Sequence, residues 1–304
     1  MKKKIVLNSF LVLTILPIAL ELLVLGGILS ESPSNKLIEF CFGKGASTQD
    51  FVEFLDVGQG DSTLIKSGNS VALIDFGVED DGIKIQKYLF RLGIKKIDVA
   101  VITHHHSDHM GGFLRVAEKI KIEKLIINNS TAEDGDTELY SEVLGLAQSL
   151  KIELILPKCG QNFKIGNADL SILSCNRNAN EENNRSVVSI LNISGKKFLF
   201  TGDCDSDTEC QLALNHNVKC DVLKMGHHGS KSSSAYYFLE LAQPEIAIAS
   251  CGYDNIYNHP SGDALLRFKE LGIEIYRTDL DKNIRFTFQN YQNSYDISIE
   301  RRSA

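Results

Sequence analysis

A run of apolar and β-branched residues, IDVAVIT at 97–103, leads directly into the polar segment HHHSDHMGG at 104–112. Branched side chains favour strands, and a strand without alternating polar residues is buried on both faces. The rest of the chain must therefore cover a sheet from both sides, which indicates a layered fold. The four histidines of the polar segment follow the end of a central strand. Binding groups often collect in loops at the carboxyl ends of such strands.

The same alternation of apolar runs and helical patterns continues along most of the chain. Strands are predicted at 51–57, 62–67, 71–77, 97–103, 123–128, 152–156, 161–166, 168–174, 186–194, 196–202, 220–226, 245–250, 273–277, 283–288 and 294–299. Helices are predicted at 81–92, 113–120, 137–150, 205–215, 234–242 and 262–272. Two mostly β halves with helices between them indicate an α+β fold, with two sheets packed together and helices outside.

The first thirty residues differ from the rest of the chain. Three lysines at positions 2–4 precede an uncharged apolar run from Ile5 to Leu20, and a second apolar run follows Glu21. A basic start before an apolar run is typical of a signal peptide, although the length also approaches that of a membrane anchor. A buried amphipathic helix is the alternative. We expect a signal peptide or anchor at 1–30, a linker at 31–49 and an extracytoplasmic domain at 50–304.

The charge and the cysteines narrow the class of protein. The 304-residue chain has a net charge of −7, which argues against a surface that coats DNA or membranes. A phosphate ester held by a metal ion stays compatible with this charge, because the ion supplies positive charge locally. The seven cysteines include no CxxC pair, so they predict no disulfide framework.

The polar segment has the spacing of a metal-binding motif. His104, His106, Asp108 and His109 form the pattern H-x-H-x-D-H. Residues two apart in an extended segment point the same way, so the first two histidines can converge. Imidazole and carboxylate groups suit zinc, manganese or iron better than calcium. The alternative is a solvated polar loop, and we expect His105 to point away from any ligand.

Two further predicted strands end in residues of the same chemistry. FLFTGD ends at Asp203, which could bridge two metal ions or cap the helix that follows. HHGSKSSS at 227–234 offers His227 and His228, of which one can bind a metal and the other a substrate. Both could instead be surface residues. Because all three features follow strands, the sequence predicts that they share one site.

Several motifs together resemble a known family. FLDVGQGDS, LIDFG, THHHSDHMGG, FLFTGD and HHGSKSSS occur here in the order found in the metallo-β-lactamase superfamily. They resemble most closely the soluble nuclease-like domain of ComEC-type competence DNA-uptake proteins, over about residues 51–287. The histidine motif is found across the superfamily, whereas DVGQGDS combined with HHGSKSSS is more specific. The resemblance implies an αββα four-layer sandwich with a two-metal hydrolase site on one edge.

The resemblance also implies roles for individual residues. The implied ligands of two divalent metal ions, zinc or manganese, are His104, His106, Asp108, His109, Asp203 and His228. His228 is preferred to His227 because it directly precedes Gly229. The residues implied to support the metals are Asp75, Gln59 and Asp61. Asp75 would orient a metal-binding histidine. The DVGQGDS segment could alternatively be only a glycine-rich hairpin.

The implied reaction is hydrolysis by metal-activated water. Asp108 would orient this water, and His259 in NHPSG would contact a substrate oxygen or protonate the leaving group. Alternatively, His259 is only a turn residue before Pro260. The residues implied to bind substrate are His227, Ser230, Lys231 and Asn183.

The chain departs from the family in two respects. Many members have a further histidine before the TGD aspartate, but here none lies between His109 and His216. The first metal is then loosely held, completed by water or absent. The full competence proteins also contain a membrane channel, which this chain does not supply. We expect a metal-dependent hydrolase of phosphate esters, DNA included. The alternatives are a hydrolase of another ester (a choline-phosphate ester or a lactone) and a non-catalytic partner of a DNA-uptake machine.

Overall fold

The computed structural model describes residues 49–129, 131–288 and 294–299. The predicted signal peptide or anchor at 1–30 lies outside the described residues. Within the described ranges, no helix is both long enough and apolar enough to cross a membrane. The chain divides into two units, one of residues 1–47 with 89–94 and the other of residues 48–88 with 95–304. Residues 89–94 of the first unit form the end of a helix and the turn after it. In this turn the Ile94 N–H donates to the Leu89 carbonyl (2.9 Å).

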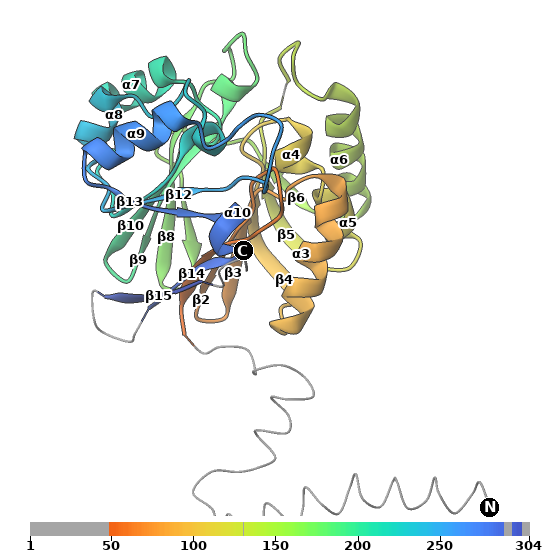
Figure 1. The fold of residues 1–304 in the computed structure, drawn as a ribbon. Coiled ribbons are helices and arrows are strands. Elements are labelled where there is room, and N and C mark those ends of the chain that lie inside the picture. Colours follow the sequence, from red (N-terminus) through yellow and green to blue (C-terminus); the bar gives the residue numbers. More distant parts are fainter. Residues whose placement is uncertain (1–48, 130, 289–293, 300–304) are drawn as a thin grey trace, which may run out of the picture. The chain divides into compact units, whose positions relative to one another are not determined.

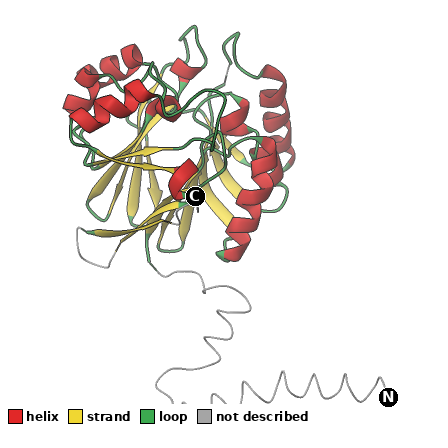
Figure 2. Cartoon of the chain, in the orientation of Figure 1, coloured by secondary structure: helices red, strands yellow, loops and turns green. Residues whose placement is uncertain are grey.

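Two mixed sheets form the centre of the second unit (Figures 1 and 2). In the described part of the chain the first sheet has eight strands, in the order β15-β14-β1-β2-β3-β4-β5-β6. Their bounds are β1 Phe51–Phe54, β2 Thr63–Ser67, β3 Ser70–Ile74, β4 Lys96–Val101, β5 Lys121–Ile126, β6 Glu153–Ile155, β14 Ile284–Phe288 and β15 Tyr295–Ile299. The strands from β3 to β6 run parallel to one another, and the other pairs are antiparallel.

The second sheet has the order β13-β12-β11-β10-β9-β8-β7. Its bounds are β7 Asn162–Ile165, β8 Ala168–Cys175, β9 Val187–Ile193, β10 Lys196–Phe200, β11 Val222–Lys224, β12 Ile246–Ala249 and β13 Glu274–Arg277. The strands from β10 to β13 are parallel, so their carboxyl ends meet at one edge of the sheet.

Helices flank the two sheets (Figure 1). Their bounds are α3 Glu79–Arg91, α4 Ser107–Met110, α5 Phe113–Ala117, α6 Thr137–Ser149, α7 Ser206–Asn215, α8 Tyr236–Ala242, α9 Gly262–Glu270 and α10 Thr278–Asp281, with short 3-10 helices η1 Asn183–Arg185 and η2 Gly226–Gly229. α7, α8 and α9 lie outside the second sheet, and α5 and α6 lie outside the first (Figure 1). Phe238 and Phe268 anchor α8 and α9 in the apolar cluster on the outer face of the second sheet.

The main core lies between the two sheets. It consists of the apolar side chains that the strands of each sheet direct towards the other sheet. Phe54 of β1 contacts Phe200 of β10 with ring centroids 6.1 Å apart, and Phe198 contacts Phe286 at 5.2 Å. All four side chains are at most 2% exposed. Burying one such ring contributes roughly 1.5–3 kcal/mol. The predicted four-layer sandwich is confirmed.

The largest departure from the predicted elements concerns the first hairpin, and it shapes the site. The strand predicted at 51–57 ends at Phe54, and a wide loop replaces the predicted tight turn. The loop does not continue the β1–β2 hydrogen-bond ladder, because it bonds instead to the histidine segment. The Asp61 N–H donates to the Asp108 carbonyl (3.1 Å). A Cβ at Gly60 would lie 2.5 Å from the same carbonyl oxygen, so this close approach requires glycine. The short α10 was also not predicted.

Candidate metal centre

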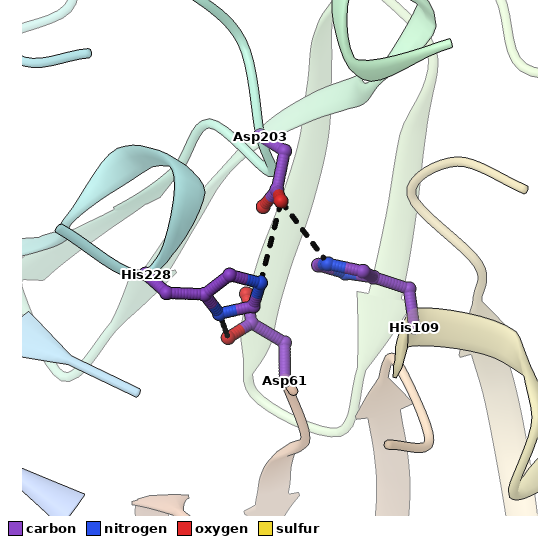
Figure 3. A group of neighbouring side chains, drawn as sticks. All are labelled: Asp61, His109, Asp203 and His228. Atoms are coloured by element: carbon purple, nitrogen blue, oxygen red, sulfur yellow. Dashed lines mark ion pairs between the residues drawn. The ribbon is translucent and has the colours of Figure 1, made fainter. Parts of the chain in front are cut away.

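Four buried side chains from four separate segments converge at one point (Figure 3). They are Asp61, His109, Asp203 and His228, and their ligand atoms all lie within 4.8 Å of one another. None of the four residues is more than 5% exposed. Asp61 lies in the β1–β2 loop, whereas the other three follow β4, β10 and β11. We call this group the Asp/His cluster.

His109 is oriented by a carboxylate on its other side. Its Nδ1 lies 2.9 Å from Oδ2 of Asp75. Asp75 also accepts hydrogen bonds from the N–H and the hydroxyl of Thr103, both at 2.8 Å. These bonds direct Nε2 of His109 towards Asp203, whose Oδ2 is 3.4 Å away. Such a carboxylate–histidine pair fixes the tautomer that presents Nε2 to a metal ion.

His228 is oriented by the backbone. Its Nδ1 donates to the Ser250 carbonyl at 3.0 Å, because a carbonyl can only accept. Its Nε2 then lies 3.3 Å from Oδ2 of Asp203 and 3.2 Å from Oδ2 of Asp108. The backbone of His228 is left-handed (φ 56°), as is that of His227 (φ 49°). This rare backbone conformation turns the His228 ring into the Asp/His cluster.

Asp61 of the Asp/His cluster forms an ion pair with the buried Lys224. Nζ of Lys224 lies 2.7 Å from Oδ2 of Asp61, and both side chains are at most 7% exposed. The other carboxylate oxygen, Oδ1, lies 3.2 Å from Nδ1 of His228. Burial alone would raise the pKa of Asp61, but Lys224 and His228 outweigh it and lower the pKa to about 2. Asp61 is therefore ionised at neutral pH.

Each residue of the Asp/His cluster has one buried side-chain atom without a hydrogen-bond partner. These atoms are Oδ1 of Asp61, Nε2 of His109, Oδ1 of Asp203 and Nε2 of His228. Buried polar atoms are ordinarily paired, because an unpaired one carries its full desolvation cost. Two imidazole nitrogens and two carboxylate oxygens match the ligand preferences of zinc or manganese. The residues present therefore fit a divalent metal ion.

The charges in the Asp/His cluster depend strongly on one another. Burial lowers the pKa of His109, but Asp203, Asp75 and Asp108 outweigh burial and raise it well above the ordinary value. The pKa of His228 is raised well above its ordinary value by Asp203 and Asp61, again against burial. Without a metal ion, protons on these imidazoles balance the carboxylates. A metal ion must displace those protons, so its affinity depends on pH.

The sequence profile of the metallo-β-lactamase superfamily matches residues 55–253. The chain belongs to the metallo-β-lactamase superfamily. ComE operon protein 3 of Bacillus subtilis (strain 168) is 28% identical over 298 residues, or 91% of this chain and 37% of that protein. Competence protein ComA of Neisseria gonorrhoeae is 33% identical over 235 residues, or 76% of this chain and 31% of that protein. The expected resemblance to ComEC-type proteins is confirmed, although the chain spans less than two fifths of these relatives.

A solved structure supports the fold assignment. CmlA, a diiron β-hydroxylase from Streptomyces venezuelae, superposes with a TM-score of 0.54 at 15% sequence identity. The match covers 79% of this chain and 54% of CmlA. This likeness concerns the metallo-β-lactamase fold alone.

The remaining residues of the superfamily's histidine motif lie next to the Asp/His cluster. Asp108 is 29% exposed in its side chain, and its Oδ1 is 3.9 Å from Nε2 of His109. The His104 ring is fully buried, with its centroid 4.1 Å from that of His109. Nε2 of His104 pairs with Nδ1 of His106 at 3.1 Å, and Nε2 of His106 lies 3.1 Å from the carbonyl oxygen of Asp134. His104 and His106 thus form a hydrogen-bonded pair outside the Asp/His cluster.

His105 has a separate, buried environment. Its Nδ1 lies 3.3 Å from Oε1 of Glu182, and its ring stacks on Tyr140 at 4.3 Å. The same carboxylate accepts the His105 backbone N–H at 2.8 Å. His105 therefore packs the histidine segment against Glu182 and Tyr140 and does not belong to the Asp/His cluster.

Of the residues predicted to contact substrate, His227 lies beside the Asp/His cluster. His227 is 3.7 Å from Asp203 through Nε2, and its ring centroid is 5.5 Å from that of His259. Ser230 bonds to the Ser232 hydroxyl at 2.9 Å, and Lys231 between them is exposed. The alternative capping role for Asp203 belongs instead to Asp205, which accepts from the Thr208 N–H at 2.8 Å.

Asn183 and Gln59, which were also predicted to belong to the site, differ in their contacts. Asn183 lies in η1, and its buried Oδ1 has no hydrogen-bond partner. Oε1 of Gln59 accepts the Gly252 N–H at 3.1 Å. Sequence reasoning missed Lys224, although a lysine within the otherwise apolar run VLKM is a detectable signal.

Proposed function

We propose that this member of the superfamily is an extracytoplasmic, metal-dependent phosphodiesterase that cleaves nucleic acid. The observation that carries the metal dependence is the Asp/His cluster, in which each of the four buried residues has a side-chain atom without a hydrogen-bond partner. The likeness to two competence proteins supports DNA as the substrate.

The Asp/His cluster would hold one divalent metal ion, and His104 and His106 are the residues proposed for a second. A bound divalent ion lowers the pKa of water and neutralises phosphate charge. The protein orients the ligands beforehand, since Asp75 and the Ser250 carbonyl fix the tautomers of His109 and His228.

Asp108 is the residue proposed to orient the attacking water. Its carboxylate is partly exposed and lies 3.2 Å from Nε2 of His228, so it faces both solvent and the Asp/His cluster. Burial opposes its ionisation, but His109 and His228 keep its pKa below the ordinary value. The carboxylate is therefore ionised at neutral pH and can orient an attacking water through a hydrogen bond.

Neighbouring side chains are proposed to position the phosphate ester. Burial and the nearby His228 and His227 lower the pKa of His259 to about 4, so this ring is neutral at pH 7. A neutral imidazole can hydrogen-bond to a substrate oxygen. Lys231, with Ser230 beside it, offers a cation and a hydroxyl group for an adjacent phosphate.

The test measures turnover of bis-p-nitrophenyl phosphate and single-stranded DNA with added manganese or zinc. We expect Asp108→Ala to reduce turnover by roughly 100-fold, because the attacking water loses the group that orients it. The matched control is Asp207→Ala, because Asp207 is an exposed aspartate at the start of α7. Equal turnover in the wild type and Asp108→Ala would remove this residue from the mechanism. Bound metal without turnover on either substrate would favour another ester or a lactone.

The proposed location rests on the basic and apolar segment at 1–30. A reporter that is active only outside the cytoplasm, fused after residue 304, tests it. We expect activity from the full fusion and none after removal of residues 1–30. Activity without this segment would contradict the proposed export.

A further inference from the structure

The loop between β12 and α9 is drawn in blue in Figure 1. Three of its large side chains are exposed. Tyr253 is 61% exposed, Ile256 is 86% exposed and Tyr257 is 60% exposed. Apolar side chains grouped in one short segment commonly mark a binding surface. We call the segment of residues 252–259 the aromatic loop.

The aromatic loop is held in shape by its own hydrogen bonds. The side chain of Asn255 donates to the carbonyls of Gly252 and His259 and accepts the His259 N–H. Asp254 and Asn258 have left-handed backbones, with φ of 53° and 55°. Such costly conformations persist when the surroundings fix them, and they cluster at binding sites. The exposed rings are thus presented on a fixed support.

The aromatic loop begins and ends beside the Asp/His cluster. At its start, the Gly252 N–H donates to Gln59, which belongs to the loop that carries Asp61. At its end, the His259 ring stacks on His228 with centroids 6.3 Å apart and planes inclined by 25°. Tyr257 stacks on His259 at 5.8 Å, also at 25°. A series of nearly parallel rings therefore leads from a proposed metal ligand to the exposed surface.

We propose that Tyr253, Ile256 and Tyr257 form a stacking platform for unpaired bases of a single-stranded nucleic acid. This inference rests on the proposed phosphodiesterase function and specifies how that site selects its substrate. Bases stack on aromatic side chains without regard to sequence. The series of parallel rings suits flat ligands, with the scissile phosphate at the Asp/His cluster and the flanking bases on the aromatic loop.

The composition of the loop favours this ligand over a protein partner. Protein interfaces are typically apolar at their centre, whereas Asp254 and Asn258 interrupt the apolar residues here. The chain has a net charge of −7, so its charge offers little general attraction for phosphates. Stacking would supply the affinity that charge does not.

The test compares two oligomers of equal length, oligothymidylate and an abasic deoxyribose-phosphate chain. Both carry the same phosphodiesters, but only the first carries bases. The full chain is assayed as wild type and as Tyr253→Ala/Tyr257→Ala, for cleavage with manganese or zinc and for binding by fluorescence anisotropy. Tyr237→Ala is the matched control, since this tyrosine of α8 is 46% exposed outside the aromatic loop.

We expect the wild type to bind and cleave oligothymidylate in preference to the abasic chain. Each tyrosine removed should weaken oligothymidylate binding about tenfold. Cleavage of the abasic chain should fall much less than cleavage of oligothymidylate, and retained cleavage of the abasic chain also shows that the variant is folded. The Tyr237→Ala control should behave as wild type.

Two results separate this inference from the proposed function. Cleavage of both oligomers with the same preference in the double variant would overturn the platform and leave the phosphodiesterase intact. If the wild type cleaves neither oligomer, the phosphodiesterase proposal fails. The binding affinities measured by fluorescence anisotropy then test the stacking platform by themselves. Equal affinity of wild type and double variant for oligothymidylate would then overturn it, leaving a protein partner for the aromatic loop.

Discussion

At the scale of single residues, Lys224 stabilises the site by forming a buried ion pair with Asp61. Its side chain is 3% exposed, and its ammonium group lies 2.7 Å from Oδ2 of Asp61. An unpaired buried charge costs several kcal/mol, so each partner depends on the other. The pair also aims the second oxygen of Asp61 at the Asp/His cluster.

Lys224→Met is therefore expected to reduce the free energy of unfolding by roughly 3–5 kcal/mol, because it leaves a buried carboxylate without its cation. Urea denaturation of the metal-free protein measures the loss. The double variant Lys224→Met/Asp61→Asn should recover much of it, since no charge is then stranded. Losses that simply add in the double variant would show that the two residues are not coupled.

At the scale of elements, the junction of α4 and α5 depends on close backbone contact. A Cβ at Gly112 would lie 2.0 Å from the Phe76 carbonyl oxygen, whereas a Cβ at Gly145 in α6 would meet no atom within 4 Å. Gly112→Ala should destabilise the protein by about 3 kcal/mol or more through overpacking. Gly145→Ala should stabilise it by roughly 0.5–1 kcal/mol through helix propensity. Thermal unfolding of the two variants checks both signs, and a stable Gly112→Ala would contradict the contact.

A buried acid links α7 to the segment that follows His228. Glu209 is fully buried and accepts the backbone N–H of Ser234 and the hydroxyl of Thr201. Burial raises its pKa to about 8, although these hydrogen bonds act in the opposite direction. The folded state therefore holds a proton that the unfolded state releases near its ordinary value of 4.5.

This difference predicts how stability depends on pH. The contribution of Glu209 is fully present below pH 4.5 and is lost as pH rises through about 8. The loss amounts to roughly 3–5 kcal/mol, given 1.36 kcal/mol per pKa unit. Glu209→Gln should unfold with a flatter pH profile between pH 5 and pH 9, whereas Glu240→Gln, exposed on α8, should keep the wild-type profile. Identical profiles for Glu209→Gln and the wild type would refute the assignment.

The elements were largely predictable because their signals are local. The strand β4 is rich in β-branched residues, and α3 is followed by Gly93, whose φ is 72°. α10 escaped prediction because four residues are too few to show a period. The width of the β1–β2 loop depends on the bond from Asp61 to Asp108, and no local pattern encodes a contact between distant segments.

At the scale of the whole molecule, the order of strands in the sheets could not be derived from the residues. β1 pairs with β14, with Phe51 opposite Thr287 near the other end of the domain. The family resemblance implied the sandwich, but only the folded chain brings Asp61 into the Asp/His cluster and separates His104 and His106 from it. Ligand chemistry is visible in the sequence, whereas the grouping of ligands is a property of the tertiary structure.

That grouping makes metal binding and folding interdependent. The four ligand atoms of the Asp/His cluster converge only in the native state, so a bound ion stabilises that state by mass action. At about 100 times the dissociation constant the gain is about 2.7 kcal/mol. We expect zinc or manganese to raise Tm and a chelator to reverse the rise. Asp203→Asn should abolish this response, while Asp207→Asn at the exposed start of α7 should retain it. A wild-type Tm that is the same with saturating metal and with chelator would mean that the Asp/His cluster binds neither ion, and the hydrolytic mechanism would lose its basis.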